Sequence, residues 1–444
     1  MHFRSILMHT ALTGIAFCAA TAHAQTDVER IQSLESRLEA QDARIAELER
    51  LLRSAAAIAP AAPVTLAAPA ASVAAPVVTI PLNRPGAHPV ISPPIAVAAE
   101  VAPAAPRLLV SGDFRLREEF NWSDEDAADR NRTVMRARLR ASYAVNDLVT
   151  VGTQISTGDP GDPNSTDLTV SDFVNDLTVS LDQAFARVNL GNLTLWGGKF
   201  ADPFRRTDLV WDGDVNPQGV AATYRQPLAE GATLDARALY FILNESVAGT
   251  GSDMLGGQLS LTVPVGQWGI ELSGGYYDYR LRSIAGADAG DFRSNLLRPD
   301  GTYLSDFNLG DVIATATWHG LGESWPIGIL GEYVHNFGSA RKRADDGYSV
   351  ELFAGRVVRQ GDWRFGYNYA ESQNESVLAA FSHDNLGFAT NYKLHALTVD
   401  HVLMAGTILN LTAYRYKPLD PLYAGANQPN DWLNRVRLNL LFNF

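Results

Sequence analysis

Residues 135–143 read MRARLRASY, so that apolar and polar side chains alternate one by one. Successive side chains of a β-strand point to opposite faces, and a period of two with one polar face indicates a strand between two different environments. The same alternation returns at residues 234–240, 255–263 and 363–369. From residue 107 onward the sequence therefore predicts an all-β fold.

The connections between these strands differ in length in a regular way. About sixteen strands fit into residues 107–444, which is typical of medium-sized membrane barrels. Tight hairpin pairs are expected at Asn146-Asp147, Gly191-Asn192, Gly266-Gln267, Gly361-Asp362 and Ala405-Gly406. Long loops are expected at 120–132, 158–177, 200–217, 283–309, 373–387 and 417–431. Short turns on one rim and long loops on the other predict an antiparallel transmembrane β-barrel, with the turns in the periplasm.

The end of the chain and the tryptophans favour the same interpretation. The last segment places Val436, Leu438, Leu440, Phe442 and Phe444 on one face and ends there. A final strand closing on phenylalanine resembles the signal that the barrel-assembly machinery recognises in bacterial outer-membrane proteins. Five tryptophans lie near predicted strand ends, where interfacial girdles place amphipathic rings: Trp268, Trp318, Trp325, Trp363 and Trp432.

The N-terminal residues are typical of an exported protein. Arg4 precedes an apolar stretch over 6–20, and Ala22-His23-Ala24 gives a cleavage pattern, so residues 1–24 are expected to be a signal peptide. Cys18 is the only cysteine, and its loss with the signal leaves no thiolate for a disulfide or metal site. No apolar run is long enough for a membrane helix, and the mean hydropathy of −0.07 suits alternating barrel strands. The net charge of −13 argues against nucleic acid as a partner.

Two further zones separate the signal from the barrel. Residues 25–53 place apolar side chains at heptad a and d positions, which predicts a short α-helical coiled coil in the periplasm: Ile31, Leu34, Leu38, Ile45, Leu48 and Leu52. An amphipathic helix lying on the chain's own barrel is the alternative. Residues 54–106 are rich in alanine and proline, which predicts an extended linker. Whether the coil or the linker contacts the cell wall stays open.

Taken with these zones, the opening strand LVSGDFRLR at 109–117 and the Arg136-x-Arg138-x-Arg140 pattern resemble the putative porin family, whose layout is related to phosphate-selective porins. The resemblance covers the whole chain, with loose motifs. It implies a passive channel with a water-filled lumen in the Gram-negative outer membrane, surrounded by lipids and lipopolysaccharide. It also implies a homotrimer, without a cofactor.

Five arginines are the first candidates for setting selectivity. A charge on the lipid face costs about 2–4 kcal/mol at mid-membrane, so the arginines of the first two strands are expected to face the lumen: Arg115, Arg117, Arg136, Arg138 and Arg140. Guanidiniums match carboxylate and phosphate oxygens, so one interpretation is a ladder that passes anions. The alternative is a basic wall neutralised by carboxylates such as Asp113 and Glu119.

The third long loop, at 200–217, is the second candidate. In general porins the third external loop folds inward, and by that analogy its charged residues would narrow the pore and face the arginines: Arg205, Arg206, Asp208, Asp212 and Asp214, with Asp202 and Trp211 beside them. The alternative is an ordinary solvated loop.

Other classes of function have weaker signals. The acidic runs near residues 124–129 and 159–172 lack the spacing of a calcium loop, so no metal site is predicted. No histidine among His319, His335, His383, His395 and His401 begins a His-x-Ser arrangement, although a hydrolase triad assembled across strands stays open. A structural tether to the cell wall, with the barrel as an anchor and a blocked lumen, is the main alternative to a channel.

Overall fold

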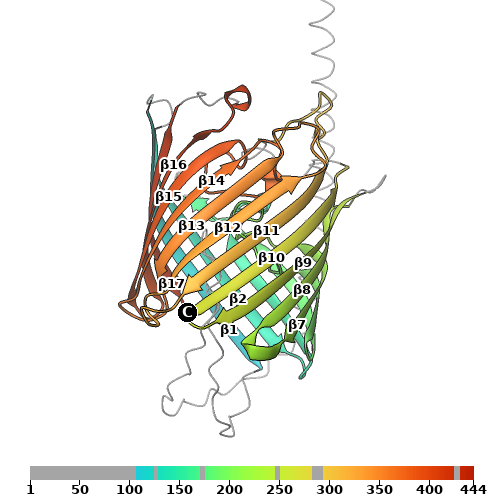
Figure 1. The fold of residues 1–444 in the computed structure, drawn as a ribbon, viewed down its shortest axis with the longest axis vertical. Helices are drawn as coiled ribbons and strands as arrows, with labels where there is room; N and C mark the ends of the chain where they lie inside the picture. Colours follow the sequence, from blue (N-terminus) through green and yellow to red (C-terminus); the bar gives the residue numbers. More distant parts are fainter. Residues whose placement is uncertain (1–106, 125–128, 171–175, 246–250, 283–293, 425–430) are drawn as a thin grey trace, which may run out of the picture. The chain divides into compact units, whose positions relative to one another are not determined.

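The computed structural model describes residues 107–124, 129–170, 176–245, 251–282, 294–424 and 431–444. The predicted signal peptide, coiled coil and linker lie outside these residues. Within them, no helix is long and apolar enough to span a membrane. The described residues form strands joined by turns and loops, with three short 3-10 turns (Figure 1).

Seventeen strands form one sheet that closes on itself. The first half contains β1 (Leu108–Ser123), β2 (Arg130–Ala144), β3 (Val149–Thr157), β4 (Leu168–Thr169), β5 (Val179–Leu190), β6 (Leu193–Lys199), β7 (Gln218–Pro227), β8 (Thr233–Asn244) and β9 (Ser252–Val265). The second half contains β10 (Trp268–Arg280), β11 (Phe307–Trp318), β12 (Ile327–Asn336), β13 (Asp346–Gly355), β14 (Trp363–Ser372), β15 (Tyr392–Met404), β16 (Thr407–Pro418) and β17 (Leu433–Asn443). Sixteen of these make the antiparallel barrel, because β4 is a two-residue strand that pairs only with β2. The predicted barrel of about sixteen strands is thus confirmed.

The first and last strands close the barrel. Phe114 pairs with Phe442 and Phe120 with Val436 in the antiparallel ladder of β1 and β17. Beyond the last strand, the Phe444 N–H donates to the Gly112 carbonyl at 3.1 Å, and the Gly112 N–H donates to the Phe444 carbonyl at 2.8 Å. A Cβ at Gly112 would lie 2.6 Å from the Arg138 carbonyl oxygen and 2.5 Å from the Phe444 ring, and the backbone oxygen cannot move aside, so the closure favours glycine there. Closure leaves no unpaired backbone edge toward lipid.

Most of the connections show the expected asymmetry between the rims, although the turn at 319–326 is longer than the connections at 124–129 and 245–251. All five predicted tight pairs lie in the short turns, and Gly266 adopts the left-handed φ of 60° that such a turn favours. We name the eight connections at the other rim L1 to L8; they comprise 124–129, 158–178, 200–217, 245–251, 281–306, 337–345, 373–391 and 419–432.

Several predicted bounds were wrong. L1 was expected over 120–132, but β1 continues to Ser123 and β2 begins at Arg130, because their ladder extends past the expected ends. β11 begins at Phe307 rather than after residue 309, and β16 continues to Pro418. L4, L6 and the turns at 228–232 and 319–326 were not predicted.

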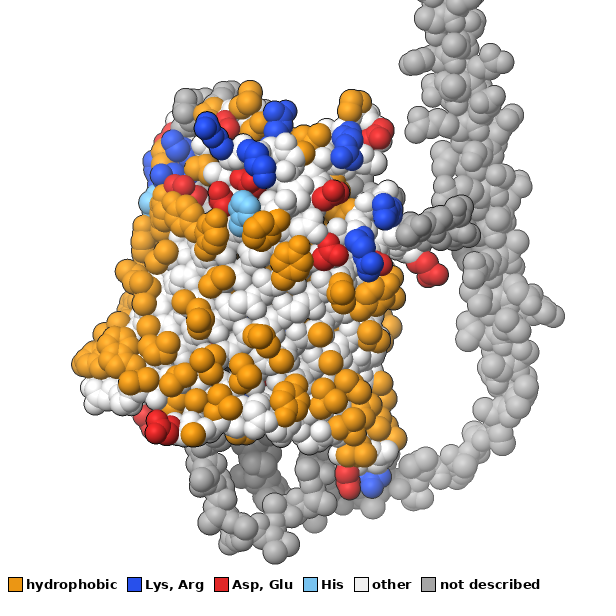
Figure 2. All heavy atoms as spheres, turned by 45° about the vertical axis from the view of Figure 1, so that its right-hand side comes forward, with side chains coloured by type: hydrophobic (Ala, Val, Ile, Leu, Met, Phe, Trp, Pro, Cys, Tyr) orange, Lys and Arg blue, Asp and Glu red, His pale blue; other side chains and the backbone are white. Residues whose placement is uncertain are grey.

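Apolar side chains cover the outside of the barrel, and the wall alternates as the sequence predicts. Leu116 and Leu139 are exposed on the outer face, whereas Arg115 and Arg138 on the same strands are buried inside. Figure 2 shows the orange apolar side chains spread over the outer wall and charged side chains gathered at the upper rim. Trp268 and Trp318 are paired across β10 and β11 at the short-turn rim, where an aromatic girdle is expected.

Candidate functional site

The five predicted arginines lie on the inner wall of β1 and β2. Arg115 pairs directly with Arg136, and Arg138 pairs with Asp113, in the ladder of the two strands. We call the set Arg115, Arg117, Arg136, Arg138 and Arg140 the basic wall. Four of its side chains are nearly inaccessible to solvent, while the Arg140 side chain is 29 % exposed. The structure therefore brings these arginines together but packs most of them away from open water.

Asp113 holds three of the five arginines. Its carboxylate lies 2.9 Å from a guanidinium nitrogen of each of Arg136, Arg138 and Arg140. Asp113 is itself on β1, two residues before Arg115, so its side chain shares the inward face with the arginines. Hydrogen bonds between ions are about twice as strong as neutral ones, so this hub fixes the guanidinium positions.

Two loops supply the other carboxylates of the basic wall. Asp167 of L2 accepts hydrogen bonds from Arg115 and, at 2.6 Å, from Arg117. Asp214 of L3 lies 2.8 Å from Arg138. Burial alone would raise the pKa of Asp167, but Arg115 and Arg117 outweigh it and hold that pKa below its usual range. Five guanidiniums therefore face three carboxylates, which favours the partly neutralised wall over a free ladder.

L3 crosses the lumen, as its analogy with porin loops predicted. Its apolar side chains are buried inside the barrel: Phe200, Phe204, Leu209, Val210, Trp211 and Val215. At one end Asp214 contacts the basic wall, and at the other Arg205 Nε lies 2.8 Å from Glu271 of β10. Thr207 donates to Glu332 of β12. L3 is therefore anchored on two sides of the barrel, at β2 and at β10 and β12.

The remaining charged residues of L3 do not meet the basic wall. Arg206 donates to the backbone carbonyls of Trp211 and Gly213 at 3.4 and 3.1 Å, so it stabilises the loop itself. Asp208 accepts from the Asn385 side chain at 3.2 Å, and Asp212 accepts from the Asp214 N–H at 2.8 Å. Of the predicted constriction candidates, only Asp214 forms an ion pair with the arginines among the described residues.

L7 also lies inside the barrel, which the sequence analysis did not predict. Trp211 of L3 stacks on Phe381 of L7 with ring centroids 6.0 Å apart, and the Asp212 N–H donates to the Phe381 carbonyl at 2.8 Å. The signal was present in the apolar run over 377–381, since such a run in a solvated external loop would be unusual. L3 and L7 together fill part of the lumen.

Burial changes the titration of the acidic loop residues. Burial raises the pKa of Asp208 most, and the nearby Asp384 carboxyl raises it further, to about 7. The same two causes raise the pKa of Asp212 well above its ordinary value, and burial raises that of Asp384. Burial lowers the pKa of His383 most, and the positive charges of Arg437 and Arg435 lower it further, to about 3. The loop interior thus disfavours net charge except where an ion pair compensates it.

β17 adds arginines that were not among the predicted site residues. Arg437 Nε lies 2.6 Å from Glu119, which also accepts from Arg132 at 2.7 Å. Arg435 donates to the Asn385 carbonyl of L7 at 2.6 Å. Both arginines belong to the polar face of the alternating last strand, so the same rule that found the basic wall locates them.

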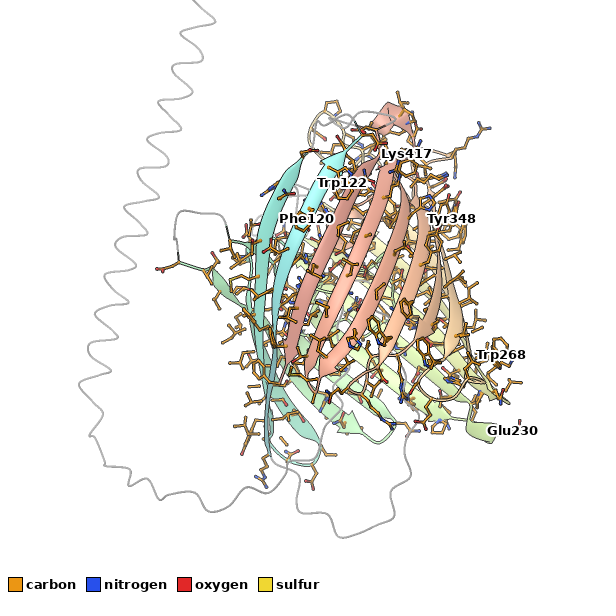
Figure 3. The ribbon with its side chains drawn as sticks, turned by 90° about the vertical axis from the view of Figure 1, so that its left-hand side faces the viewer. Phe120, Trp122, Glu230, Trp268, Tyr348 and Lys417 are labelled. Atoms are coloured by element: carbon orange, nitrogen blue, oxygen red, sulfur yellow. The ribbon has the colours of Figure 1, made fainter. Side chains whose placement is uncertain are left out.

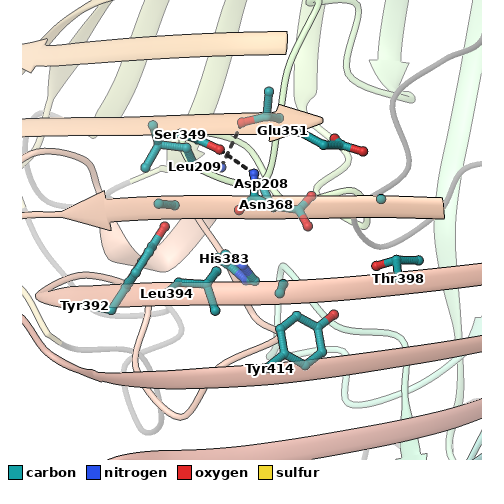
Figure 4. Close-up of a pocket in the computed structure, with 14 residues that line it drawn as sticks. Asp208, Leu209, Ser349, Glu351, Asn368, His383, Tyr392, Leu394, Thr398 and Tyr414 are labelled. Carbon is teal, nitrogen blue, oxygen red and sulfur yellow. Dashed lines mark hydrogen bonds between the residues drawn. The ribbon is translucent and has the colours of Figure 1, made fainter. Parts of the chain in front are cut away.

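The opposite side of the barrel carries buried acids. Asp311 of β11 and Glu332 of β12 are 2 % and 4 % exposed, and we call this pair the acidic wall. In the closed strand order, β10 and β11 lie half-way around from β1 and β2. Between the walls, a cavity of about 60 Å³ lies against L3, L7 and β13 to β16. Figure 4 shows hydroxyl, amide and carboxylate groups lining it, with the Asn368 amide donating to Ser349 at 2.7 Å.

One group at the long-loop rim has the composition of a metal site. His335, Asp345 and Asp346 bring ligand atoms within 4.8 Å of one another. His335 Nδ1 already lies 2.8 Å from Asp346, and the Tyr333 hydroxyl donates to the same carboxylate at 2.6 Å. These contacts account for the arrangement without an ion.

A closed sixteen-stranded antiparallel barrel with an inward-folded third loop is the fold of outer-membrane porins. The sequence profile of the putative porin family matches residues 105–283, so the predicted resemblance is confirmed over these residues. The chain is similar in fold to Pseudomonas putida OprB, with 14 % identity and a TM-score of 0.52 over 76 % of this chain and 94 % of that one.

Two more distant barrels align over the same share of this chain. Salmonella typhi OmpF in complex with daunomycin is 12 % identical with a TM-score of 0.47 over 97 % of its chain. Vibrio cholerae OmpT in a trimer form is 12 % identical with a TM-score of 0.45 over its full chain. No curated protein matches the sequence.

Proposed function

We propose that the protein is a porin that lets small hydrophilic solutes and ions diffuse across the outer membrane, with a preference for anions. The observation that carries the proposal is the inward-facing basic wall, in which five guanidiniums meet three carboxylates inside a closed barrel. The net charge of the whole chain is −13, and this charge taken alone would predict a channel that prefers cations. Charges farther than a Debye length of about 8 Å from the ion path are largely screened, so the wall decides.

The arrangement of charges across the lumen supports the same proposal. The basic wall and the acidic wall lie on opposite sides of the barrel, and L3 contacts the first through Asp214 and the second through Thr207, which donates to Glu332. Arg140, the most exposed member of the basic wall, is the arginine best placed to meet a passing anion.

Single-channel recording tests the proposal. The purified full chain is inserted into planar bilayers between KCl solutions of different concentration, and the zero-current potential is measured. We expect discrete conductance steps and a potential whose sign shows chloride permeating faster than potassium. A heat-denatured sample is the control for contaminating channels. Steps with a cation-type potential would disprove the anion preference while leaving the channel.

The structural tether stays the second candidate, because L3 and L7 pack against each other inside the barrel. A tether needs no conducting lumen, so absence of conductance from correctly folded protein would favour it over the channel. Folding is checked by heat-modifiable gel migration, which separates a closed barrel from a misfolded sample.

We also propose that residues 25–53 form a periplasmic coiled coil between copies of the chain, as the heptad pattern predicts, and that the assembly is a homotrimer, as the resemblance to porins implies. Deleting these residues is expected to weaken the oligomer and leave the barrel insertable. Chemical cross-linking of the intact and shortened chains measures this. Identical cross-linked ladders would show that the coil does not associate.

A further inference from the structure

Like charges lie opposite each other on the outer wall of β15 and β16. Lys393 pairs directly with Lys417 in the ladder, and His395 pairs directly with Arg415. The side chains of these four residues point outward, because successive side chains of a strand alternate and the neighbouring Leu394 and Tyr416 are buried inside the barrel. Like charges directly opposite in an antiparallel pair are destabilising. The Lys393–Lys417 pair is of this kind, and it points to an anion that compensates the two ammonium groups.

Trp432 gathers these cations into one patch. The Arg415 guanidinium lies 5.1 Å from the Trp432 ring centroid and the Lys417 ammonium lies 5.0 Å from it. Figure 3 shows Lys417 near the upper rim of this wall, close to the level of Trp122. Two cations on one ring are held in place at the depth where tryptophan marks the membrane interface.

The carboxylates near the patch do not satisfy all of it. Lys393 lies 3.1 Å from Glu371, and Arg415 lies 3.3 Å from Asp124, whose side chain is half exposed. Among the residues that the structure describes, Lys417 has no carboxylate within ion-pair distance. The patch thus keeps one cation in excess, and exposed pairs of this kind contribute at most about 1 kcal/mol each.

The position of the patch indicates which anion it meets. It lies where β15 begins after L7 and where β16 ends before L8, at the long-loop rim that faces the outside of the cell. Below it, exposed Leu397, Leu411 and Leu438 offer an apolar surface to acyl chains. The outer leaflet of this membrane carries glycolipids with phosphate groups. On the same rim, Arg280 lies 2.6 Å from Asp253 and is therefore neutralised by a carboxylate. The patch differs from this pair because it has one more cation than it has carboxylates.

We propose that Lys393, Arg415, Lys417 and Trp432 form a docking site for the phosphate group of an outer-leaflet glycolipid of the lipopolysaccharide type, with its acyl chains on the leucines below. The proposal rests on the orientation of the barrel in the proposed porin and does not require that it conducts.

Lipid binding to the refolded full chain tests this site. The probe is bisphosphorylated lipid A added to the protein in detergent, with binding measured by native mass spectrometry. Each basic residue near an anionic surface contributes about fivefold to binding, so the combined K393Q, R415Q and K417Q variant is expected to bind at least about tenfold more weakly. R280Q, on the same rim but paired with Asp253, is the matched control and should bind like the wild type.

Three outcomes would overturn the proposal. These are unchanged lipid A binding in the triple variant, equal binding of dephosphorylated lipid A, and competition by inorganic phosphate at equimolar concentration, which would indicate a site for the free ion. If the triple variant does not fold, K417Q alone is used, since it breaks no ion pair among the described residues. Conductance should be the same in all variants, so a failed lipid site and a failed channel are told apart.

Discussion

The basic wall and the acidic wall bury ionisable side chains in different ways. The basic wall gathers its arginines on two paired strands and takes carboxylates from β1, L2 and L3. The acidic wall has one acid on each of two strands, and Thr207 of L3 donates to one of them, Glu332. Breaking a buried ion pair costs about 3–5 kcal/mol, so Arg115 and Arg117, whose carboxylate partner is Asp167, are stabilised only while L2 stays inside. L3 therefore links the ion selectivity of the proposed channel to the stability of the fold.

The largest expected effect comes from removing charge from the basic wall. Replacing Arg136, Arg138 and Arg140 together with Gln leaves Asp113 and Asp214 without their cations, so the zero-current potential should change toward cation preference. Stability should fall as well, because two of these side chains are almost fully buried. R225Q is the control, since Arg225 is 67 % exposed at the short-turn rim. An unchanged potential in the triple variant would place these arginines away from the ion path.

The second effect concerns the hub of the basic wall. D113N removes the carboxylate that three arginines share, so that Arg140 loses its ion-pair partner and the buried Arg136 and Arg138 keep only Asp214. The loss should cost up to about 3–5 kcal/mol. Denaturant unfolding followed by gel migration measures the change. The zero-current potential should move toward stronger anion preference, opposite to the arginine variant. A movement in the same direction would contradict the assignment of Asp113 to the wall.

The third effect separates the two anchors of L3. D214N loosens the loop from the basic wall, and R205Q loosens it from Glu271 on β10. Each loses charge-assisted hydrogen bonds worth about 1.5–3 kcal/mol, so both should raise conductance and make it noisier. Only D214N should also increase anion preference, because it removes a carboxylate from the basic wall. Equal selectivity in the two variants would show that the ends of L3 are equivalent.

The smallest effect is expected from pH. Burial and Asp384 raise the pKa of Asp208 from 3.8 to about 7, so the folded loop holds this proton more tightly than the unfolded chain does. The packing of L3 on L7 should therefore lose stability as pH rises from about 4 through about 7. We expect higher conductance at pH 8 than at pH 5, measured in the same bilayer. D208N should flatten this difference, and a pH response that survives D208N would assign it to other groups.

The barrel was predictable from the sequence because its signal is local. Alternation at 135–143 and in the last strand assigns each side chain to one of two faces, and this holds whichever strand lies alongside. The alternation placed all five arginines of the basic wall inside the barrel, and it would have placed Arg435 and Arg437 there as well. The tight turns followed from glycine and asparagine pairs for the same reason.

The neutralisation of the arginines was only partly predictable. Asp113 was a foreseeable partner because it shares the inward face of β1, and Asp214 followed from the analogy with a porin loop. Asp167 belongs to the acidic run near residues 159–172, for which the sequence predicted no site, yet it lies against Arg115 and Arg117. Loop carboxylates reach the wall through contacts between residues far apart in the chain, and composition does not reveal such contacts.

The sequence by itself determined the class of fold, the inward direction of the arginines and the end of the barrel at Phe444, since period-two alternation is a property of each strand alone. Only the tertiary structure decided that L3 and L7 enter the lumen, that five guanidiniums share three carboxylates, and that Lys393 faces Lys417. These depend on strand register and on loops meeting across the barrel. A shift by one residue in any ladder would change them without changing the local pattern.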